Sequence, residues 1–188
     1  KLANEGAIVS LAPGDRLASI YKRSFENLRI LKLKDFESKR VTASDFDLQS
    51  PLGSICQYRF TSLKDYGQSS PILSADEAKT AKCRQRYFDG RPLIGISWQG
   101  GGKPNRVAIK SINLKQLTPL LECEEFRFVS LQYGDDAPHL ERYRKNSGIE
   151  VLHDDEIDPL KDMDGWLSQV AAMDAVISIA NTTVHGAG

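Results

Sequence analysis

The sequence lacks an excess of charge of either sign, because its 188 residues include 25 Lys and Arg against 25 Asp and Glu. The protein therefore has no overall field to attract nucleic acid or an anionic membrane. Long apolar runs are also missing, and none approaches the roughly 20 residues needed to cross a bilayer. We expect neither a nucleic-acid partner nor a membrane span.

Cysteine is scarce, with only Cys56, Cys83 and Cys123, far apart in the chain. No Cys or His spacing is typical of a zinc site, and an odd number of cysteines does not indicate a disulfide framework. We expect reduced structural thiols, which favours a cytoplasmic location. We also find no metal motif, no Ser/His/Asp spacing and no paired carboxylates of catalytic type.

Short apolar runs alternate with helical patterns, which predicts an α/β fold. In the first half, strands are expected at 7–11 and 28–33, with a helix between them that Asp15 caps. A strand, a helix and a strand within about 30 residues have the size of a βαβ unit. Weaker patterns predict a strand at 47–49 and a helix at 54–60.

The second half gives a clearer pattern. We expect strands at 93–98, 126–132, 149–152 and 175–179, with helices over 114–121, 137–145 and 166–173. Regular alternation of this kind predicts a doubly wound parallel sheet with right-handed crossovers. Ser74 is expected to cap the helix before this sheet and Asp164 the last helix in it. Pro119 suits the first turn of a helix that begins at Thr118.

A polar, turn-rich segment at 67–71 predicts a domain boundary. We assign 1–70 to an N-terminal domain, 71–92 to a linker and helix, and 93–188 to a C-terminal domain. The chain ends as a new helix begins, so we expect both domains to be incomplete in this chain.

Ligands of open α/β sheets bind beyond the carboxyl ends of the strands, where three segments of the second half are expected to lie. The first is 98–103, Trp-Gln-Gly-Gly-Gly-Lys, whose glycine N–H groups can approach an anion. It matches neither a dinucleotide fingerprint nor a P-loop, and Pro104 argues against a helix directly after it. Arg106 and Lys110 follow as cationic partners. A plain surface loop with a solvated basic face explains the same residues.

The second segment, 131–136, places Asp136 just past a strand, where a carboxylate can accept hydrogen bonds from a ribose diol. The alternative is that Asp135 and Asp136 simply cap the next helix.

The third segment follows the last predicted strand and contains Asn181, Thr182, Thr183 and His185. Free N–H groups at a helix start attract anions, and an imidazole can donate to a phosphate oxygen. A helix cap beside a packed histidine is the alternative.

Taken in order, the segments 128–135, 156–165 and 173–188 resemble the glycosyltransferase family 9-like region of bacterial tetratricopeptide-repeat (TPR) proteins. They resemble lipopolysaccharide heptosyltransferases and the O-GlcNAc transferase catalytic region more distantly. Ile94-Gly95-Ile96-Ser97-Trp98 and Lys110-Ser111-Ile112 fit the same pattern. The resemblance is dense over 93–188 and thin over 1–70.

This resemblance implies a GT-B fold of two facing Rossmann-like domains, with a nucleoside-diphosphate sugar as donor, no essential metal and no other cofactor. An acceptor hydroxyl, on a glycan, a lipid-linked sugar or a protein, would attack the sugar. The residues implied to bind the diphosphate are Asn181, Thr182, Thr183, His185, Gln99, Gly100, Gly101 and Lys110. Those implied to lie near the ribose and base are Asp136, Tyr133 and Met163.

Two positions depart from the family pattern. Ala180 stands where many relatives have Asp, and Lys110 stands where Arg is usual. A catalytically inactive nucleotide-binding or scaffold module is therefore the alternative to an active transferase. The general base of such folds usually comes from the N-terminal domain, and no residue is assigned to that role.

Overall fold

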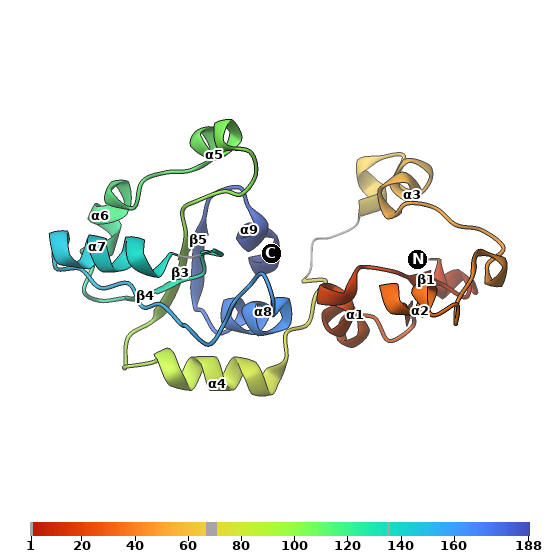
Figure 1. Cartoon of the computed structure of the whole chain (residues 1–188), viewed down its shortest axis with the longest axis horizontal. Coiled ribbons are helices and arrows are strands. Elements are labelled where there is room, and N and C mark those ends of the chain that lie inside the picture. Colours follow the sequence, from red (N-terminus) through yellow and green to blue (C-terminus); the bar gives the residue numbers. More distant parts are fainter. Residues whose placement is uncertain (1, 67–70, 135) are drawn as a thin grey trace. The chain divides into compact units, whose positions relative to one another are not determined.

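The computed structural model describes residues 2–66, 71–134 and 136–188, and the chain divides into two compact units, Lys1–Ser74 and Ala75–Gly188. Each unit contains a small parallel sheet with helices, so the predicted mixed α/β class is confirmed (Figure 1). Residues 67–70 of the boundary segment expected at 67–71, and the proposed cap Asp135, lie outside the described residues.

Unit 1 is built on one βαβ crossover. Strands β1 (Ser10–Leu11) and β2 (Arg29–Ile30) pair in parallel, and helix α1 (Ala18–Ser24) connects them. The remaining helices are α2 (Leu33–Glu37) and α3 (Leu52–Arg59), with 3-10 turns η1 (Ala3–Glu5), η2 (Asp15–Leu17), η3 (Ala43–Asp45) and η4 (Leu63–Tyr66). The predicted βαβ unit and the helix near 54–60 are confirmed.

Three expectations for unit 1 were wrong. Residues 47–49 form no strand, and Leu48 is 91% exposed, because no neighbouring strand is there to pair with them. The second strand ends at Ile30, because Leu33 already begins α2. Asp15 does not cap the first helix, since its Oδ1 accepts the Leu33 N–H at 2.9 Å and so joins the two crossover ends.

The core of unit 1 is small. Its fully buried apolar side chains are Ala18, Ile20, Leu31 and Val41, whereas Ile8 and Leu63 are at least 90% exposed. Among the described residues of this unit, the buried apolar side chains therefore come from α1 and from the chain that follows β2.

Unit 2 contains three strands, β3 (Leu93–Ser97), β4 (Arg127–Ser130) and β5 (Ala175–Ser178). Its helices are α4 (Glu77–Tyr87), α5 (Pro104–Lys110), α6 (Thr118–Leu121), α7 (Ala137–Ser147), α8 (Met163–Ala171) and α9 (Thr182–Ala187), with the 3-10 turn η5 (Leu114–Leu117) before α6. The strand order is β4-β3-β5, and the pairing is parallel throughout, which confirms the predicted parallel sheet.

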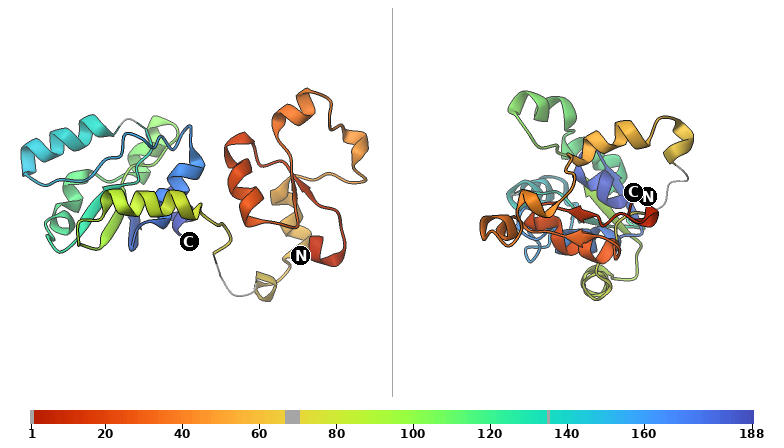
Figure 2. Two further views of the ribbon diagram at one scale, coloured as in Figure 1. Left: turned by 90° about the horizontal axis from the view of Figure 1, so that it is seen from below. Right: turned by 90° about the vertical axis from the view of Figure 1, so that its right-hand side faces the viewer.

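Both faces of this sheet are covered at β3, which explains the nearly continuous apolar run of that strand (Figure 2), whereas Ala175 and Ile177 of the edge strand β5 are exposed. On one face, Ile94 and Ile96 pack with Phe128 and with residues of α6 and α7, including Leu121 and Leu140. On the other face lies a second cluster, which α4 and the end of α8 cover: Cys83, Tyr87, Leu93, Val129 and Ala172.

The expected strand at 149–152 is reduced to one bridge, in which Leu152 pairs in parallel with Val129. The Leu152 N–H donates to Phe128 O at 2.9 Å, and the Ser130 N–H donates to Leu152 O at 2.8 Å. This segment therefore occupies the position of a fourth strand, next to β4, without extending along it.

Two predicted caps were displaced by two residues. Asp76, not Ser74, caps α4 by accepting the Lys79 N–H at 2.9 Å. Asp162, not Asp164, caps α8 by accepting the Gly165 N–H at 2.8 Å. Asp76 directly precedes the first residue of α4, whereas Ser74 lies two residues too early. Helix α8 begins at Met163, earlier than expected, so Asp162 is at its N-cap and Asp164 lies inside the first turn.

The expectation that no helix follows the glycines directly was also wrong, because α5 begins at Pro104. Proline lacks only an N–H that has no partner at this position, so it suits the first residue of a helix. The expectation that regular helix begins at Thr118 is confirmed by α6.

Candidate switch-point site

The strand order of unit 2 contains one reversal. From β3 the chain moves to β4 and then to the Leu152 bridge on one side, and it returns to β5 on the other side. In such sheets the crevice beyond the carboxyl ends of the two strands at the reversal is the usual ligand site. Here those strands are β3 and β5, and the segments that leave them begin at Trp98 and Ile179. We call this region the switch point.

The buried side chain of Gln132 ties β4 to the segment that follows β3. Its Oε1 accepts the Gln99 N–H at 2.9 Å and the Trp98 N–H and Ser97 hydroxyl at 3.2 Å. Its Nε2 donates to Gln99 O at 2.9 Å and to Tyr133 O at 3.3 Å. Gln132 therefore fixes the course of the backbone as it enters the glycine segment.

Asn181 makes the matching connection from β5. Its Nδ2 donates to Ser97 Oγ at 2.8 Å and to Gln99 O at 3.4 Å. Its Oδ1 accepts from Ser178 Oγ and from the Thr183 N–H, both at 2.9 Å. Ser97 thus stands between Gln132 and Asn181, and a continuous chain of hydrogen bonds joins the ends of all three strands.

The glycine segment lies against Lys110 and Tyr133. A Cβ on Gly100 would lie 3.2 Å from Lys110 Cβ and 3.6 Å from Ile179 Cδ1. A Cβ on Gly101 would lie only 2.5 Å from the Tyr133 hydroxyl oxygen. A side chain at Gly101 would displace the Tyr133 hydroxyl and one at Gly100 would press against Lys110, so the glycine backbone, a cation and an aromatic ring lie close together at the switch point.

Not every glycine N–H is open to a ligand. The Gly100 N–H donates to Ser111 Oγ at 3.0 Å, and the Gln99 N–H is bound to Gln132. The anion-binding donors that the sequence predicted in this segment therefore reduce to those beyond Gly100, beside the exposed Lys110.

The first residues of α9 include both exposed and buried polar side chains. Thr182 and His185 are exposed, whereas Thr183 is fully buried. Over the described residues, the buried Thr183 hydroxyl has no hydrogen-bond partner. Gly186 allows α9 to pack on α8, since a Cβ there would lie 2.7 Å from Trp166 Cη2.

Asp136, which was predicted to bind a ribose, is buried in the protein. It occupies the N-cap position of α7 and is 4% exposed. Its Oδ2 accepts from Ser130 Oγ at 2.5 Å, and its Oδ1 lies 3.2 Å from His153 Nδ1. The other ring nitrogen of His153 lies 3.2 Å from Asp155 Oδ1, so this histidine bridges two carboxylates.

The structure therefore gathers Gln99, Gly100, Gly101, Lys110, Tyr133 and Asn181, and it engages Asp136 elsewhere. Met163 is the first residue of α8 and is half-buried. Sequence reasoning missed Gln132, Ser97 and His153 as organising residues. Their partners are distant in sequence, and only the strand order brings them together.

No family model matches the chain, and no solved structure matches it. Among curated proteins it is similar to Protein FlbA of Caulobacter vibrioides, with 25% identity over 192 residues. The alignment covers 96% of the chain and 32% of FlbA, so the chain spans about a third of the length of this relative. Both units therefore have counterparts in that protein.

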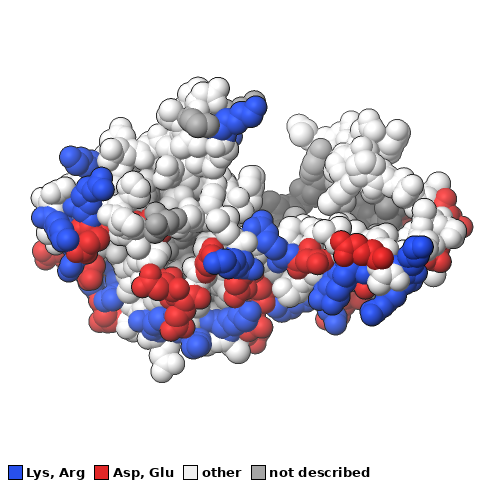
Figure 3. Space-filling view, viewed as in Figure 1, with Lys and Arg blue, Asp and Glu red and all other residues white. Residues whose placement is uncertain are grey.

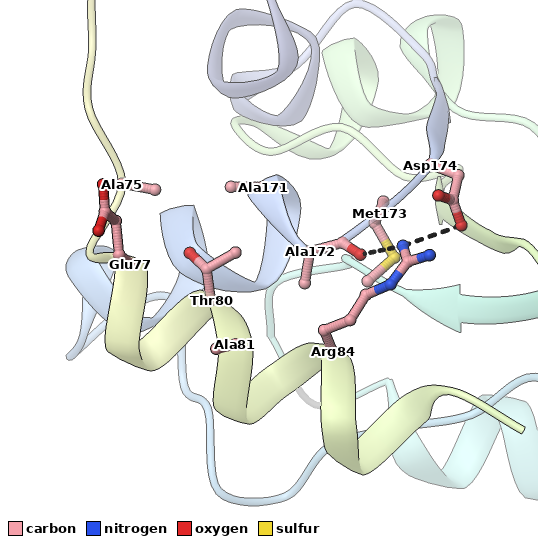
Figure 4. Close-up of a pocket in the computed structure, with 9 residues that line it drawn as sticks. All are labelled: Ala75, Glu77, Thr80, Ala81, Arg84, Ala171, Ala172, Met173 and Asp174. Atoms are coloured by element: carbon pink, nitrogen blue, oxygen red, sulfur yellow. Dashed lines mark hydrogen bonds and ion pairs between the residues drawn. The ribbon is translucent and has the colours of Figure 1, made fainter.

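A separate hollow of about 620 Å³ lies between α4 and the end of α8 (Figure 4). Arg84 crosses it, donating to Ala172 O at 2.9 Å and pairing with Asp174 at 2.9 Å. Asp174 also accepts the Leu93 N–H at 2.7 Å, and the Arg84 guanidinium holds the pKa of this carboxyl below its usual value. This hollow is at the amino ends of β3 and β5, the end of the sheet opposite the switch point.

Two further properties bear on function. Within residues 2–66, 71–134 and 136–188, no group of three or more His, Cys, Asp or Glu side chains is arranged to hold a metal ion. Over the same residues, every helix is too short or too polar to cross a bilayer.

Proposed function

We propose that unit 2 binds the diphosphate of a nucleoside-diphosphate sugar at the switch point, and that the protein transfers the sugar to an acceptor hydroxyl. One observation carries the proposal. The ends of β3, β4 and β5 are joined through Gln132, Ser97 and Asn181, and this frame holds a glycine backbone beside Lys110 at the reversal of strand order. Backbone donors and a cation at such a crevice suit a pyrophosphate group.

The resemblance to GT-B glycosyltransferases supports the reaction class and, with it, the assignment of unit 1 to the acceptor side. In this reaction the acceptor oxygen bonds to the anomeric carbon as the bond from that carbon to the diphosphate breaks. The acceptor proton passes to a base, and the nucleoside diphosphate leaves with the bonding electrons. Lys110 and the N–H groups beyond Gly100 would stabilise the developing negative charge.

The proposal changes the expected role of one residue. Because both carboxylate oxygens of Asp136 face protein groups, we assign Asp136 to joining the start of α7 to Ser130 and His153. Tyr133, beside Gly101, is the better candidate for contact with the ribose or base. A role for Met163 near the base and for Thr182 and His185 at the diphosphate stays a prediction.

Calorimetric titration of the protein with UDP, ADP and GDP tests the binding step. We expect one of the three to bind at micromolar strength, and Lys110→Gln to weaken that binding about tenfold, since a hydrogen bond to a charged group contributes about 1.5–3 kcal/mol. Lys115→Gln is the matched control, because Lys115 is an exposed cation on η5, outside the cluster. Absence of heat with all three nucleotides would overturn the proposal.

Ala180 favours a second candidate, a module that binds the nucleotide without transferring sugar, because many relatives have Asp at this position. This version predicts nucleoside diphosphate binding with no release of nucleoside diphosphate from donor sugars. A coupled assay for that release, run on UDP-, ADP- and GDP-sugars, separates the two candidates.

A further inference from the structure

Unit 1 has a hollow of its own, independent of the switch point. Its volume is about 700 Å³, within the range of about 300–1,000 Å³ that small-molecule sites occupy. The walls come from α1, from β2 and from the beginning of α2, through the apolar residues Ala18, Leu28 and Ile30 and several charged side chains.

Basic side chains dominate the rim. Four exposed cations line the hollow: Lys22, Arg29, Lys32 and Lys34. Figure 3 shows blue side chains over the part of the molecule that α1 and α2 form. Across residues 2–66, 71–134 and 136–188, none of the four forms an ion pair. In unit 2, by contrast, Arg84, Arg86 and Arg127 are all paired with carboxylates.

The two carboxylates of the hollow are already engaged with the backbone. Asp15 Oδ1 accepts the Leu33 N–H at 2.9 Å, and Asp35 Oδ2 accepts the Lys32 N–H at 2.8 Å. These bonds fix the turn between β2 and α2, and so they fix the backbone that carries Lys32 and Lys34. The carboxylates shape the site without pairing with its cations, and the cations exceed them two to one.

We infer that this hollow is a binding site for a small molecule that carries a phosphate or carboxylate group. An anion among four unpaired cations forms charge-assisted hydrogen bonds and relieves the repulsion between them. Arg29 offers a planar fork that can bind two oxygens at once, and the lysines add point charges around it. The apolar floor at Ala18, Leu28 and Ile30 would contact the uncharged part of the ligand.

Residue-resolved NMR on the full chain tests this inference, with inorganic phosphate and glucuronate as probes and glucose as the neutral comparison. We expect saturable shifts of amide signals within residues 15–35 for at least one of the two anions and none for glucose. The two anions separate phosphate from carboxylate recognition. Sodium chloride should weaken the binding, because exposed charges are screened.

Variants complete the test. Lys22→Gln combined with Arg29→Gln should weaken the binding of the anion about tenfold, because two charge-assisted contacts are removed. Arg40→Gln, an exposed cation of the same unit outside the hollow, should leave it unchanged. An unaltered amide spectrum of the double variant establishes that unit 1 remains folded. Equal binding by the double variant, glucose shifts equal to those of glucuronate, or no saturable shifts with either anion overturns the inference.

Discussion

Both units contain strands joined by helices in a βαβ pattern, but the strands differ in length and in burial. In unit 1 the paired strands have two residues each, and Ile8, Leu48 and Leu63 are almost fully exposed. In unit 2 strand β3 has five residues, all of them buried, between helices on both faces. The longest strand is therefore the one that has a neighbour on each side and helices on both faces to bury it, and the edge strand β5 is shorter and partly exposed.

The two units also differ in how deeply their ion pairs are buried. In unit 2 the Asp154 carboxylate, 3% exposed, accepts from Arg86 Nη1 at 2.6 and 2.7 Å and from the Tyr87 hydroxyl. These contacts attach α4 to the segment after Leu152. In the described part of unit 1, the ion pair of Arg59 with Glu5 is at least one-third exposed on both sides.

The largest expected effect comes from removing that buried carboxylate. Asp154→Ala should lower the free energy of unfolding of unit 2 by about 3–5 kcal/mol, because Arg86 and Tyr87 lose a buried partner. Denaturant unfolding followed by tryptophan fluorescence measures this unit alone, since both tryptophans, Trp98 and Trp166, lie in it. Glu156→Ala, at the exposed end of the same network, should cost less than about 1 kcal/mol. Equal costs for the two variants would contradict this account.

The second largest effect is expected from truncating a buried isoleucine in the core of each unit. Ile96→Ala should lower the stability of unit 2 by about 2–5 kcal/mol, because it leaves a cavity at a fully buried position. Ile20→Ala makes the same change at a position 1% exposed in unit 1. It should shift methyl NMR signals of unit 1 and change the tryptophan transition by less than about 0.5 kcal/mol. A shared loss of both signals would show that the units do not unfold separately.

The smallest effect depends on pH. Burial, together with the hydrogen bond to Asp154, raises the pKa of Tyr87 far above its ordinary value of 10.0. The folded state therefore retains a proton that the unfolded chain loses above pH 10. The stability of unit 2 should fall by up to about 1.4 kcal/mol per pH unit there, and the ionisation of Tyr87 should cause no change of stability with pH well below pH 10.

Tyr87→Phe provides the control for the alkaline effect. It should be less stable than the wild type at pH 7, since Asp154 and Gln169 lose a partner. Its stability should also fall less steeply above pH 10, measured by fluorescence at pH 9, 10 and 11. An unchanged slope would assign the alkaline loss to another group.

The strands of unit 2 were predictable to within a few residues, because an apolar run between turn residues leaves few alternatives. The segment at 149–152 is also mainly apolar, yet only Leu152 pairs, and nothing local in the sequence distinguishes it from a full strand. The caps at Asp76 and Asp162 were missed because several capping residues stand close together and geometry alone selects one.

The segments that form the candidate site could be predicted from the sequence, but the hydrogen bonds between them could not. Gln99, Gly100 and Asn181 were identified because they follow strands. Their connection through Gln132 spans more than 30 residues of sequence, so no local spacing could show it. The role of Asp136 was ambiguous for the same reason, since His153 comes near it only through the fold.

Two hydrogen bonds close the base of the segment that contains α5, and they determine how far this segment can change in length. The Gly100 N–H donates to Ser111 Oγ, and the Ile112 N–H donates to Trp98 O, both at 3.0 Å. The ten residues between Gly100 and Ser111 therefore form a segment whose two ends are held together by these hydrogen bonds. Insertions and deletions within residues 103–109 would leave the sheet intact and would keep Gly101 and Lys110 at the closed base of this segment, so its outer part can change while the strands and the candidate site stay the same.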